Sequence, residues 1–156
     1  MNIDAEFTHT QNQAIEYLFD STTTEVLFGG AAGGGKSWVG CSWLVLMCLK
    51  HPKTRYLMGR SKLSSLKTTT LNTFFEVCDT WGLKAGTHYT FNAGSNIIKF
   101  YNKSEVMLKD LFLYPSDRNF DNLGSLEITG AFIDEANQIT EKAKNIVSSR
   151  IRYKLD

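Results

Sequence analysis

Short apolar runs alternate with helical apolar stripes along the first part of the chain. Four apolar residues share one face of a helix predicted over residues 8–19, which Thr8 or Thr10 can cap. The run over residues 25–28 ends in glycines and predicts a buried strand. A mostly apolar segment after these glycines predicts a second helix, which continues to about Lys50 and ends at a histidine-proline pair.

The next segment repeats this alternation. Residues 55–58 predict a second buried strand that ends at Gly59. Apolar residues then recur at steps of three, four and five over residues 62–81, which predicts an amphipathic helix with Gly82 at its C-terminal cap. The run of three threonines at residues 68–70 weakens this helix prediction, because β-branched residues are poor helix formers.

Shorter strands follow. Residues 89–91, 97–101 and 106–108 predict three strands joined by tight turns, which favours antiparallel pairing. A polar loop is predicted at 117–124, an apolar strand at 126–133, and a helix at 140–153 with Thr140 as its cap. The order of these elements predicts an α/β domain built around a mainly parallel sheet.

Composition narrows the class of protein. The chain has 156 residues, of which 42% are hydrophobic and 21% charged, as expected for one globular domain. Lys and Arg (17) balance Asp and Glu (16), whereas a dedicated nucleic-acid binder usually carries a larger basic excess. Three cysteines without a C-x-x-C pair exclude a disulfide scaffold and a cysteine zinc site, and they fit a reducing compartment. The longest apolar stretch, at 38–49, is too short to span a bilayer, so we expect no membrane contact.

The glycine-rich segment after the first strand fits the pattern G-x-x-x-x-G-K-[ST] at every fixed position. Its residues are Gly30, Ala31, Ala32, Gly33, Gly34, Gly35, Lys36 and Ser37. Small residues let backbone N–H groups wrap phosphates, and the following helix adds partial positive charge. Lys36 can reach the outer phosphates, and Ser37 can offer its hydroxyl to Mg²⁺. The strand before the loop and the helix after it favour this interpretation over a flexible loop with a surface lysine.

Two adjacent carboxylates follow the strand at 126–133. Asp134 and Glu135 would lie at the C-terminal end of that strand, the edge at which ligands bind in open α/β sheets. We expect Asp134 to hold Mg²⁺ through water and Glu135 to polarise the water that attacks the γ-phosphate. Two acids that merely begin a solvated turn or helix are the alternative.

Five segments together resemble one protein family. They read FTHTQ, EVLFGGAAGGGKS, YLMGRS, LGSLEITGAFIDEANQI and SSRIR. They resemble the N-terminal ATPase domain of the terminase large subunit, the motor with which tailed bacteriophages and prophages package DNA into procapsids. The resemblance implies a P-loop NTPase fold of the ASCE, RecA-like type. In this fold helices flank a mainly parallel sheet, here with a β-hairpin insertion before the Walker B strand.

The resemblance also implies residue roles. Gln11 matches the glutamine that reads adenine, with Gln13 as its rival. Residues 30–37 match Walker A, Asp134 matches Walker B, and Glu135 matches the catalytic glutamate, so ATP and Mg²⁺ are the implied cofactors. Many relatives carry an arginine inside the P-loop, which this chain lacks, so an arginine finger must lie elsewhere. The candidates are Arg118, Arg60, Arg150 and Arg152, and we favour Arg118 because its polar loop could face a neighbouring subunit.

Partners and location follow from the same resemblance. It implies a homo-oligomeric ring that acts on double-stranded DNA together with the portal protein and the small terminase subunit. The implied location is the bacterial host cytoplasm, at the procapsid portal. Five basic residues near the C-terminal end could face DNA phosphates, although a solvated helix face is the better explanation. These residues are Lys142, Lys144, Arg150, Arg152 and Lys154.

Family members continue with a further ATPase motif and an RNase H-like nuclease domain. We therefore expect residues 1–156 to be a partial ATPase domain without the nuclease, whether as a fragment, a truncated gene product or one piece of a split protein. In such cores another strand usually lies between the Walker A and Walker B strands. Its absence predicts a gap between buried strands, with unpaired backbone groups.

Three functions stay open at this point. An ATP-hydrolysing DNA-translocation domain fits best. A P-loop small-molecule kinase would not need Glu135 beside Asp134, because its substrate is the nucleophile. A non-catalytic module that binds nucleotide or partner subunits is the third.

Overall fold

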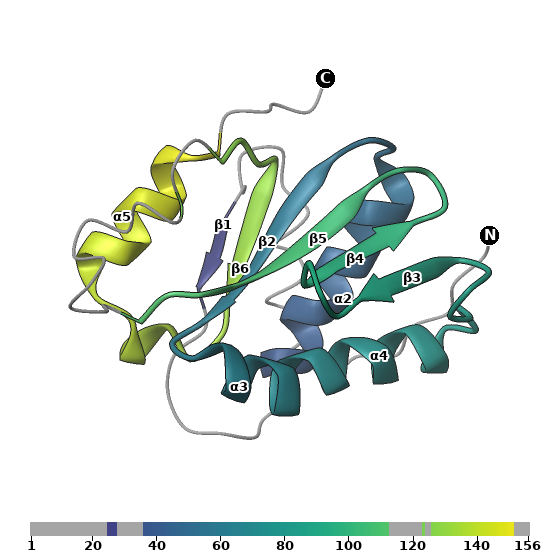
Figure 1. The fold of residues 1–156 in the computed structure, drawn as a ribbon, viewed down its shortest axis with the longest axis horizontal. Helices are drawn as coiled ribbons and strands as arrows, with labels where there is room; N and C mark the ends of the chain where they lie inside the picture. Colours follow the sequence, from purple (N-terminus) through teal and green to yellow (C-terminus); the bar gives the residue numbers. More distant parts are fainter. Residues whose placement is uncertain (1–24, 28–35, 113–122, 124–125, 152–156) are drawn as a thin grey trace.

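The computed structural model of the protein describes residues 25–27, 36–112, 123 and 126–151. Within these residues, six strands form one sheet in the order β1-β6-β2-β5-β4-β3 (Figure 1). The strands are β1 (Glu25–Leu27), β2 (Arg55–Arg60), β3 (Tyr89–Asn92), β4 (Ile97–Phe100), β5 (Glu105–Asp110) and β6 (Gly130–Ile133). The helix predicted over residues 8–19 and all but Leu123 of the loop predicted at 117–124 lie outside the described residues.

The sheet is parallel through β1, β6, β2 and β5. β4 and β3 extend it as an antiparallel hairpin beside β5. The structure therefore confirms three predictions: the mainly parallel sheet, the antiparallel pairing, and the hairpin before β6, the strand that Asp134 follows. β2 extends two residues beyond its predicted end, because Gly59 and Arg60 still pair with β5.

The predicted gap in the sheet is wrong for the described residues. β1 and β6 pair directly and in parallel, with Glu25 opposite Ala131 and Leu27 opposite Ile133. β6 also pairs with β2 on its other side, so that Ile133 lies opposite Gly59. The backbone groups of β6 thus find partners on both neighbouring strands, and these strands need no further strand between them to satisfy their hydrogen bonds.

The helices are α2 (Lys36–Lys50), α3 (Leu63–Ser65), α4 (Leu71–Thr80) and α5 (Glu141–Ser149). A π-helical turn, η1 (Leu66–Thr70), joins α3 to α4, and a 3-10 turn, η3 (Ala136–Gln138), precedes α5. The helix predicted over 62–81 is thus present, with a wider turn at its threonine run. α5 is shorter than predicted, because the chain turns at Arg150 and Ile151 forms a bridge with Ile128.

The predicted helix caps at Gly82 and Thr140 are confirmed, whereas the cap predicted at Thr8 or Thr10 lies outside the described residues. Gly82 has a φ of 74°, and the N–H groups of Gly82 and Leu83 donate to the carbonyls of Asp79 and Cys78 at 3.1 and 2.8 Å. This is a Schellman motif, which needs a residue such as glycine in the left-handed region. At α5, the Thr140 hydroxyl accepts a hydrogen bond from the Ala143 N–H at 3.2 Å.

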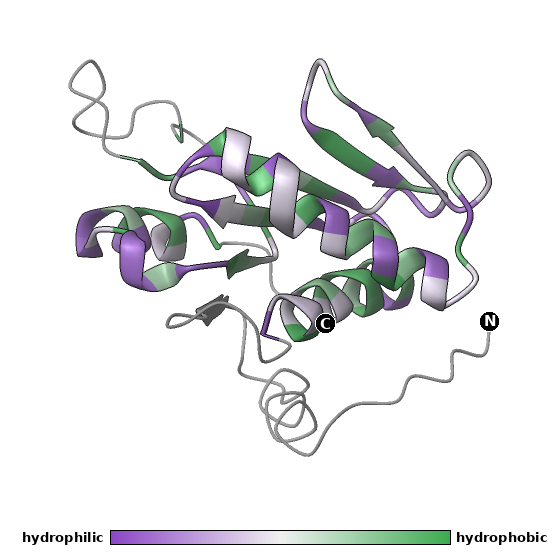
Figure 2. Ribbon diagram, turned by 90° about the horizontal axis from the view of Figure 1, so that it is seen from below, coloured by the Kyte–Doolittle hydropathy of each residue, from purple (hydrophilic) through white to green (hydrophobic). Residues whose placement is uncertain are grey.

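Alternate residues of the central strands face two separate cores. Tyr56, Met58 and Phe132 pack with α2 and α4 on one face, whereas Leu57 and Ile133 pack on the opposite face, with α5. Burial on both faces explains why these strands read as continuous apolar runs. In Figure 2 α2 is largely hydrophobic, whereas α4 and α5 alternate hydrophobic and hydrophilic residues, as expected of covering helices.

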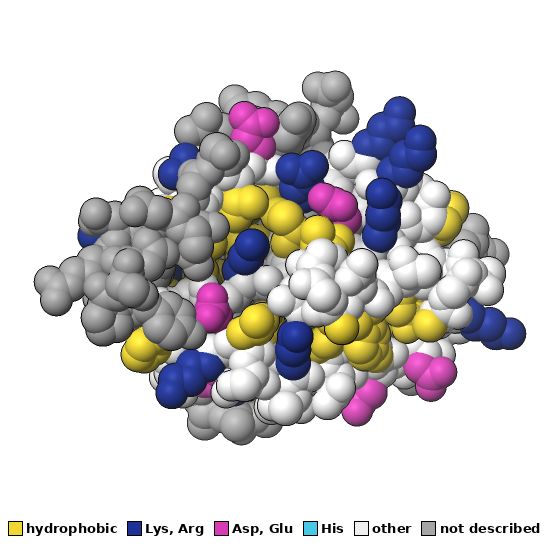
Figure 3. All heavy atoms as spheres, in the orientation of Figure 1, with side chains coloured by type: hydrophobic (Ala, Val, Ile, Leu, Met, Phe, Trp, Pro, Cys, Tyr) yellow, Lys and Arg dark blue, Asp and Glu magenta, His cyan; other side chains and the backbone are white. Residues whose placement is uncertain are grey.

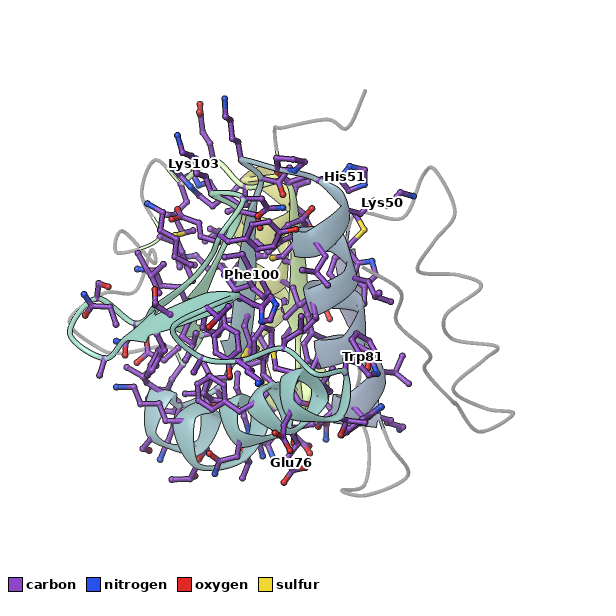
Figure 4. All side chains as sticks on the ribbon, turned by 90° about the vertical axis from the view of Figure 1, so that its right-hand side faces the viewer. Lys50, His51, Glu76, Trp81, Phe100 and Lys103 are labelled. Atoms are coloured by element: carbon purple, nitrogen blue, oxygen red, sulfur yellow. The ribbon has the colours of Figure 1, made fainter. Side chains whose placement is uncertain are left out.

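The hairpin closes one end of the first core. Figure 4 shows Phe100 of β4 pointing between the sheet and the helices, while Glu76 of α4 points outward. Phe100 is 2% exposed and forms edge contacts with Phe74 of α4, at a ring-centroid distance of 6.2 Å. No helix in the described part of the chain is both long and apolar enough to cross a membrane.

α2 and β6 approach each other closely at one glycine. A Cβ atom placed on Gly40 would lie 2.2 Å from Cζ of Phe132 and within 2.6 Å of two further atoms of that ring. Phe132 is fully buried, so its ring has little room to move. Glycine is therefore required here for packing, although it lowers the helix propensity of α2.

We expect Gly40→Ala to destabilise the protein by about 1–3 kcal/mol, because the overlap outweighs the gain of about 1 kcal/mol in helix propensity. Urea unfolding followed by circular dichroism measures this change. Ser42→Ala in the same helix is the control, since the buried Ser42 hydroxyl has no hydrogen-bond partner among the described residues and its loss should cost little. Adding Phe132→Leu to Gly40→Ala should recover part of the loss, and strictly additive effects would contradict the proposed overlap.

The three cysteines should be inert in the folded protein. Cys41, Cys48 and Cys78 are all fully buried. Burial raises the pKa of the Cys78 thiol to about 12, so about one thiol in ten thousand is ionised at pH 8. Burial also raises the pKa of Cys41, and the nearby charge of Asp134 raises it further. A disulfide reagent at pH 8 should therefore react with all three thiols in denaturant and with almost none in buffer. Rapid reaction of the native chain would contradict this burial.

Candidate nucleotide-binding site

The candidate site lies at the carboxyl edge of the parallel strands. Asp134 follows β6 directly, and Arg60 is the last residue of β2. Lys36 and Ser37 begin α2, and Thr70 ends η1. Four elements from three separate parts of the sequence therefore meet at this edge, where open α/β sheets bind their ligands.

The Asp134 carboxylate is the centre of the site. Its Oδ2 atom accepts hydrogen bonds from the Ser37 hydroxyl at 2.9 Å and the Thr70 hydroxyl at 2.7 Å, and it lies 3.4 Å from an Arg60 nitrogen. Its Oδ1 atom accepts from the Glu135 backbone N–H at 3.0 Å. Asp134 is only 3% exposed, so these donors replace most of the water that would otherwise solvate its charge.

The Ser37–Asp134 pair fits a magnesium ion. Ser37 gives its single proton to Asp134, which leaves lone pairs of the hydroxyl oxygen available to a cation. The donor set consists of a hydroxyl and a carboxylate, the hard oxygen ligands that Mg²⁺ prefers. Because the Asp134 oxygens already accept hydrogen bonds, this residue suits contact through metal-bound water.

Glu135 has an unusual backbone conformation. Its φ and ψ are 53° and 47°, in the left-handed region. The other described non-glycine residues with positive φ, namely Lys53, Asn96 and Lys103, lie in turns. Glu135 also lies in a turn, which links β6 to η3 beside the Asp134 carboxylate. A strained residue at such a place is a frequent mark of a functional site.

Two threonines of the site were not singled out from the sequence. The Arg60 guanidinium donates to the hydroxyls of Thr69 and Thr70 at 2.8 and 3.2 Å. Thr70 is fully buried, although threonine is usually exposed. The one sequence signal for this pair was the threonine run inside an otherwise amphipathic helix.

The structure brings together only some of the predicted site residues. Ser37 contacts Asp134, the Glu135 backbone N–H donates to Asp134, and Lys36 is exposed at the start of α2. Among the arginine candidates, Arg60 contacts Asp134 of its own chain. The Arg150 carbonyl accepts a hydrogen bond from the Ile128 N–H, upstream of β6 and so at the opposite end of that strand from Asp134. Several candidates lie outside the described residues: Gln11, Gln13, residues 30–35, Arg118 and Arg152.

Solved structures share this fold. The large terminase of the thermophilic bacteriophage D6E matches with a TM-score of 0.75 and 16% identity, over 96% of this chain and 37% of that chain. The HK97 bacteriophage large terminase matches with a TM-score of 0.68 and 12% identity, over 94% of this chain and 30% of that chain. The large terminase ATPase domain of Thermus phage P74-26 matches with a TM-score of 0.63 and 17% identity, over 96% of this chain and 63% of that chain.

The chain thus spans just over a third of the first of these terminases. No curated protein matches the sequence. A family model described as phage terminase large subunit matches residues 21–156, which is most of the chain. This protein therefore belongs to the phage terminase large subunit family.

Proposed function

We propose that this chain binds and hydrolyses ATP as the motor domain of a DNA-packaging terminase. The observation that carries the proposal is the 2.9 Å hydrogen bond between Ser37 and Asp134, which joins the end of the phosphate-loop motif to the acid after β6. These two residues are 97 positions apart in sequence, and only the fold brings them together. Large terminase structures of bacteriophage D6E are also known in complex with ADP and with ATP-gamma-S.

Each residue of the site has a task in this reaction. Lys36 would bind the outer phosphates of ATP, since it is exposed and is the first residue of the helix after the loop. Ser37 and Asp134 would hold Mg²⁺, the hydroxyl directly and the carboxylate through water. A bound Mg²⁺ supplies positive charge that offsets the charge developing on the phosphates.

Glu135 would act on the attacking water. The left-handed backbone directs the chain away from β6 directly after Asp134. Glu135 is half-buried, and within the described residues its carboxylate has no hydrogen-bond or ion-pair partner. A carboxylate in this position can accept a proton from water as a general base. This activation of water distinguishes hydrolysis from transfer to a kinase substrate.

The partners belong to the same proposal. We infer that the chain works in a homo-oligomeric ring on double-stranded DNA, with the portal protein and the small terminase subunit, in the bacterial host cytoplasm. The proposal also includes adenine recognition by Gln11, phosphate wrapping by residues 30–35 and an arginine finger at Arg118.

On the face seen in Figure 3, basic side chains of the described residues are interspersed with acidic ones. The charges on this face do not mark a path for DNA.

We expect Lys36→Ala to weaken Mg-ATP binding by at least about 10-fold, because a charge-assisted contact to phosphate contributes about 1.5–3 kcal/mol. Calorimetry on the full chain measures the affinity. Lys50→Ala is a matched control, since Lys50 is an exposed lysine at the other end of the same helix. Equal affinities of the wild type and both variants would contradict the role of Lys36. Absence of binding by the wild type would contradict the proposed function.

We expect Glu135→Gln to keep Mg-ATP binding and to lower phosphate release by about 100-fold or more, as for loss of a general base. Turnover is followed by a phosphate assay after the affinity of the variant has been checked. Glu141→Gln is the control, because the side chain of Glu141 is 82% exposed and pairs with Lys144 on α5. A variant that turns over ATP at the wild-type rate would remove Glu135 from the mechanism. A wild type that binds ATP without hydrolysing it would favour the non-catalytic module.

A further inference from the structure

We propose that Thr70 is a positioning residue that fixes the Asp134 carboxylate in the orientation needed to hold the cation. This inference rests on the proposed function of the same site. Thr70 is fully buried, and its hydroxyl donates to Asp134 Oδ2 at 2.7 Å, the shortest of the hydrogen bonds that the Asp134 carboxylate accepts. Thr70 would not touch the substrate or the reacting atoms, so its effect on the reaction would pass through Asp134.

The direction of the hydrogen bonds follows from the chemistry of the three groups. Arg60 has only donors, so the Thr70 oxygen must accept from it, at 3.2 Å. The Asp134 carboxylate accepts, so the single Thr70 proton must point toward it. Thr70 therefore has one hydroxyl orientation that satisfies both neighbours. Because Arg60 fixes the orientation of the Thr70 hydroxyl, this hydroxyl restrains the rotation of the Asp134 carboxylate more firmly than a freely rotating hydroxyl would.

Arg60 is itself held in place. Its closest contact in the cluster is the Thr69 hydroxyl, at 2.8 Å, whereas its distance to Asp134 is 3.4 Å. The guanidinium thus lies nearer to the two threonines than to the carboxylate. Arg60 supplies positive charge near the Asp134 carboxylate, while Thr70 makes the short directional contact with it.

The π-turn explains how Thr70 reaches the site. In η1 the Leu71 N–H donates to the Leu66 carbonyl, five residues back instead of four. The wider turn brings Leu66 and Leu71 close to one line along the helix, and both side chains are buried. Because this turn contains one residue more than an α-helical turn, the buried apolar stripe continues from Leu66 to Leu71 while Thr70 also faces inward. A regular helix would rotate the residues after the turn by about 100° relative to this arrangement.

A matched set of variants separates positioning from structural support. Thr70→Val keeps the shape of the side chain and removes the hydroxyl, and Thr70→Ser keeps the hydroxyl. Thr68→Val is the control, because Thr68 is exposed and its hydroxyl donates within the helix, to the Ser64 and Ser65 carbonyls at 3.0 and 3.3 Å. Circular dichroism and thermal unfolding establish that each full-length variant is folded.

The readout is the gain in nucleotide affinity that Mg²⁺ provides. The dissociation constant of a non-hydrolysable ATP analogue is measured once with excess Mg²⁺ and once with a chelator. We expect Thr70→Val to reduce the magnesium-dependent gain by about 10- to 100-fold, the usual effect of removing a group that orients a metal ligand. Affinity in chelator should stay at the wild-type value. Thr70→Ser and Thr68→Val should keep the wild-type gain.

Several results would overturn the proposal. A wild-type gain in Thr70→Val would show that Asp134 does not need the hydroxyl. Equal weakening with and without Mg²⁺, or failure of Thr70→Ser to restore the gain, would assign Thr70 a packing role. A wild type that binds no nucleotide in either condition would instead refute the proposed function, and the role of Thr70 with it. Nucleotide binding by the wild type therefore distinguishes failure of the Thr70 proposal from failure of the proposed function.

Discussion

A carboxylate that is almost excluded from water must be surrounded by hydrogen-bond donors, and much of this structure is arranged to meet that demand at Asp134. The donors come from the first turn of α2, the end of β2, the last residue of η1 and the backbone of Glu135. None of these elements could move away without leaving a buried charge poorly solvated. The Asp134 backbone N–H also donates to the Gly59 carbonyl at 2.9 Å, so β2 holds the same residue from its other side.

Local patterns in the sequence were sufficient to predict much of the fold. The apolar runs of β2 and β6 predicted buried strands because both faces of this part of the sheet are covered, and Gly82 and Thr140 marked helix ends through their own chemistry. The acidic pair was predictable because it follows an apolar strand. The pairing of β1 with β6 was not, because strand order depends on contacts between residues more than 100 positions apart.

The site was predictable only in part, for a related reason. Ser37 and Asp134 belong to sequence patterns that reflect their chemistry, whereas Thr70 becomes a site residue only through the π-turn. One extra residue in a helical turn leaves little trace in an apolar periodicity that tolerates steps of three, four and five. The threonine run looked like a weak point of the helix. In the structure the hydroxyls of Thr69 and Thr70 accept from Arg60, and the same Thr70 hydroxyl donates to Asp134.

The close approach of Gly40 to Phe132 has a mechanical consequence. Gly40 lies three residues after Ser37 in α2, and Phe132 lies two residues before Asp134 in β6. Because the two residues pack in direct contact, a displacement of α2 would also displace β6. The spacing between the Ser37 hydroxyl and the Asp134 carboxylate therefore depends on this contact. A substitution at Gly40 or Phe132 would therefore also change the spacing between the Ser37 hydroxyl and the Asp134 carboxylate.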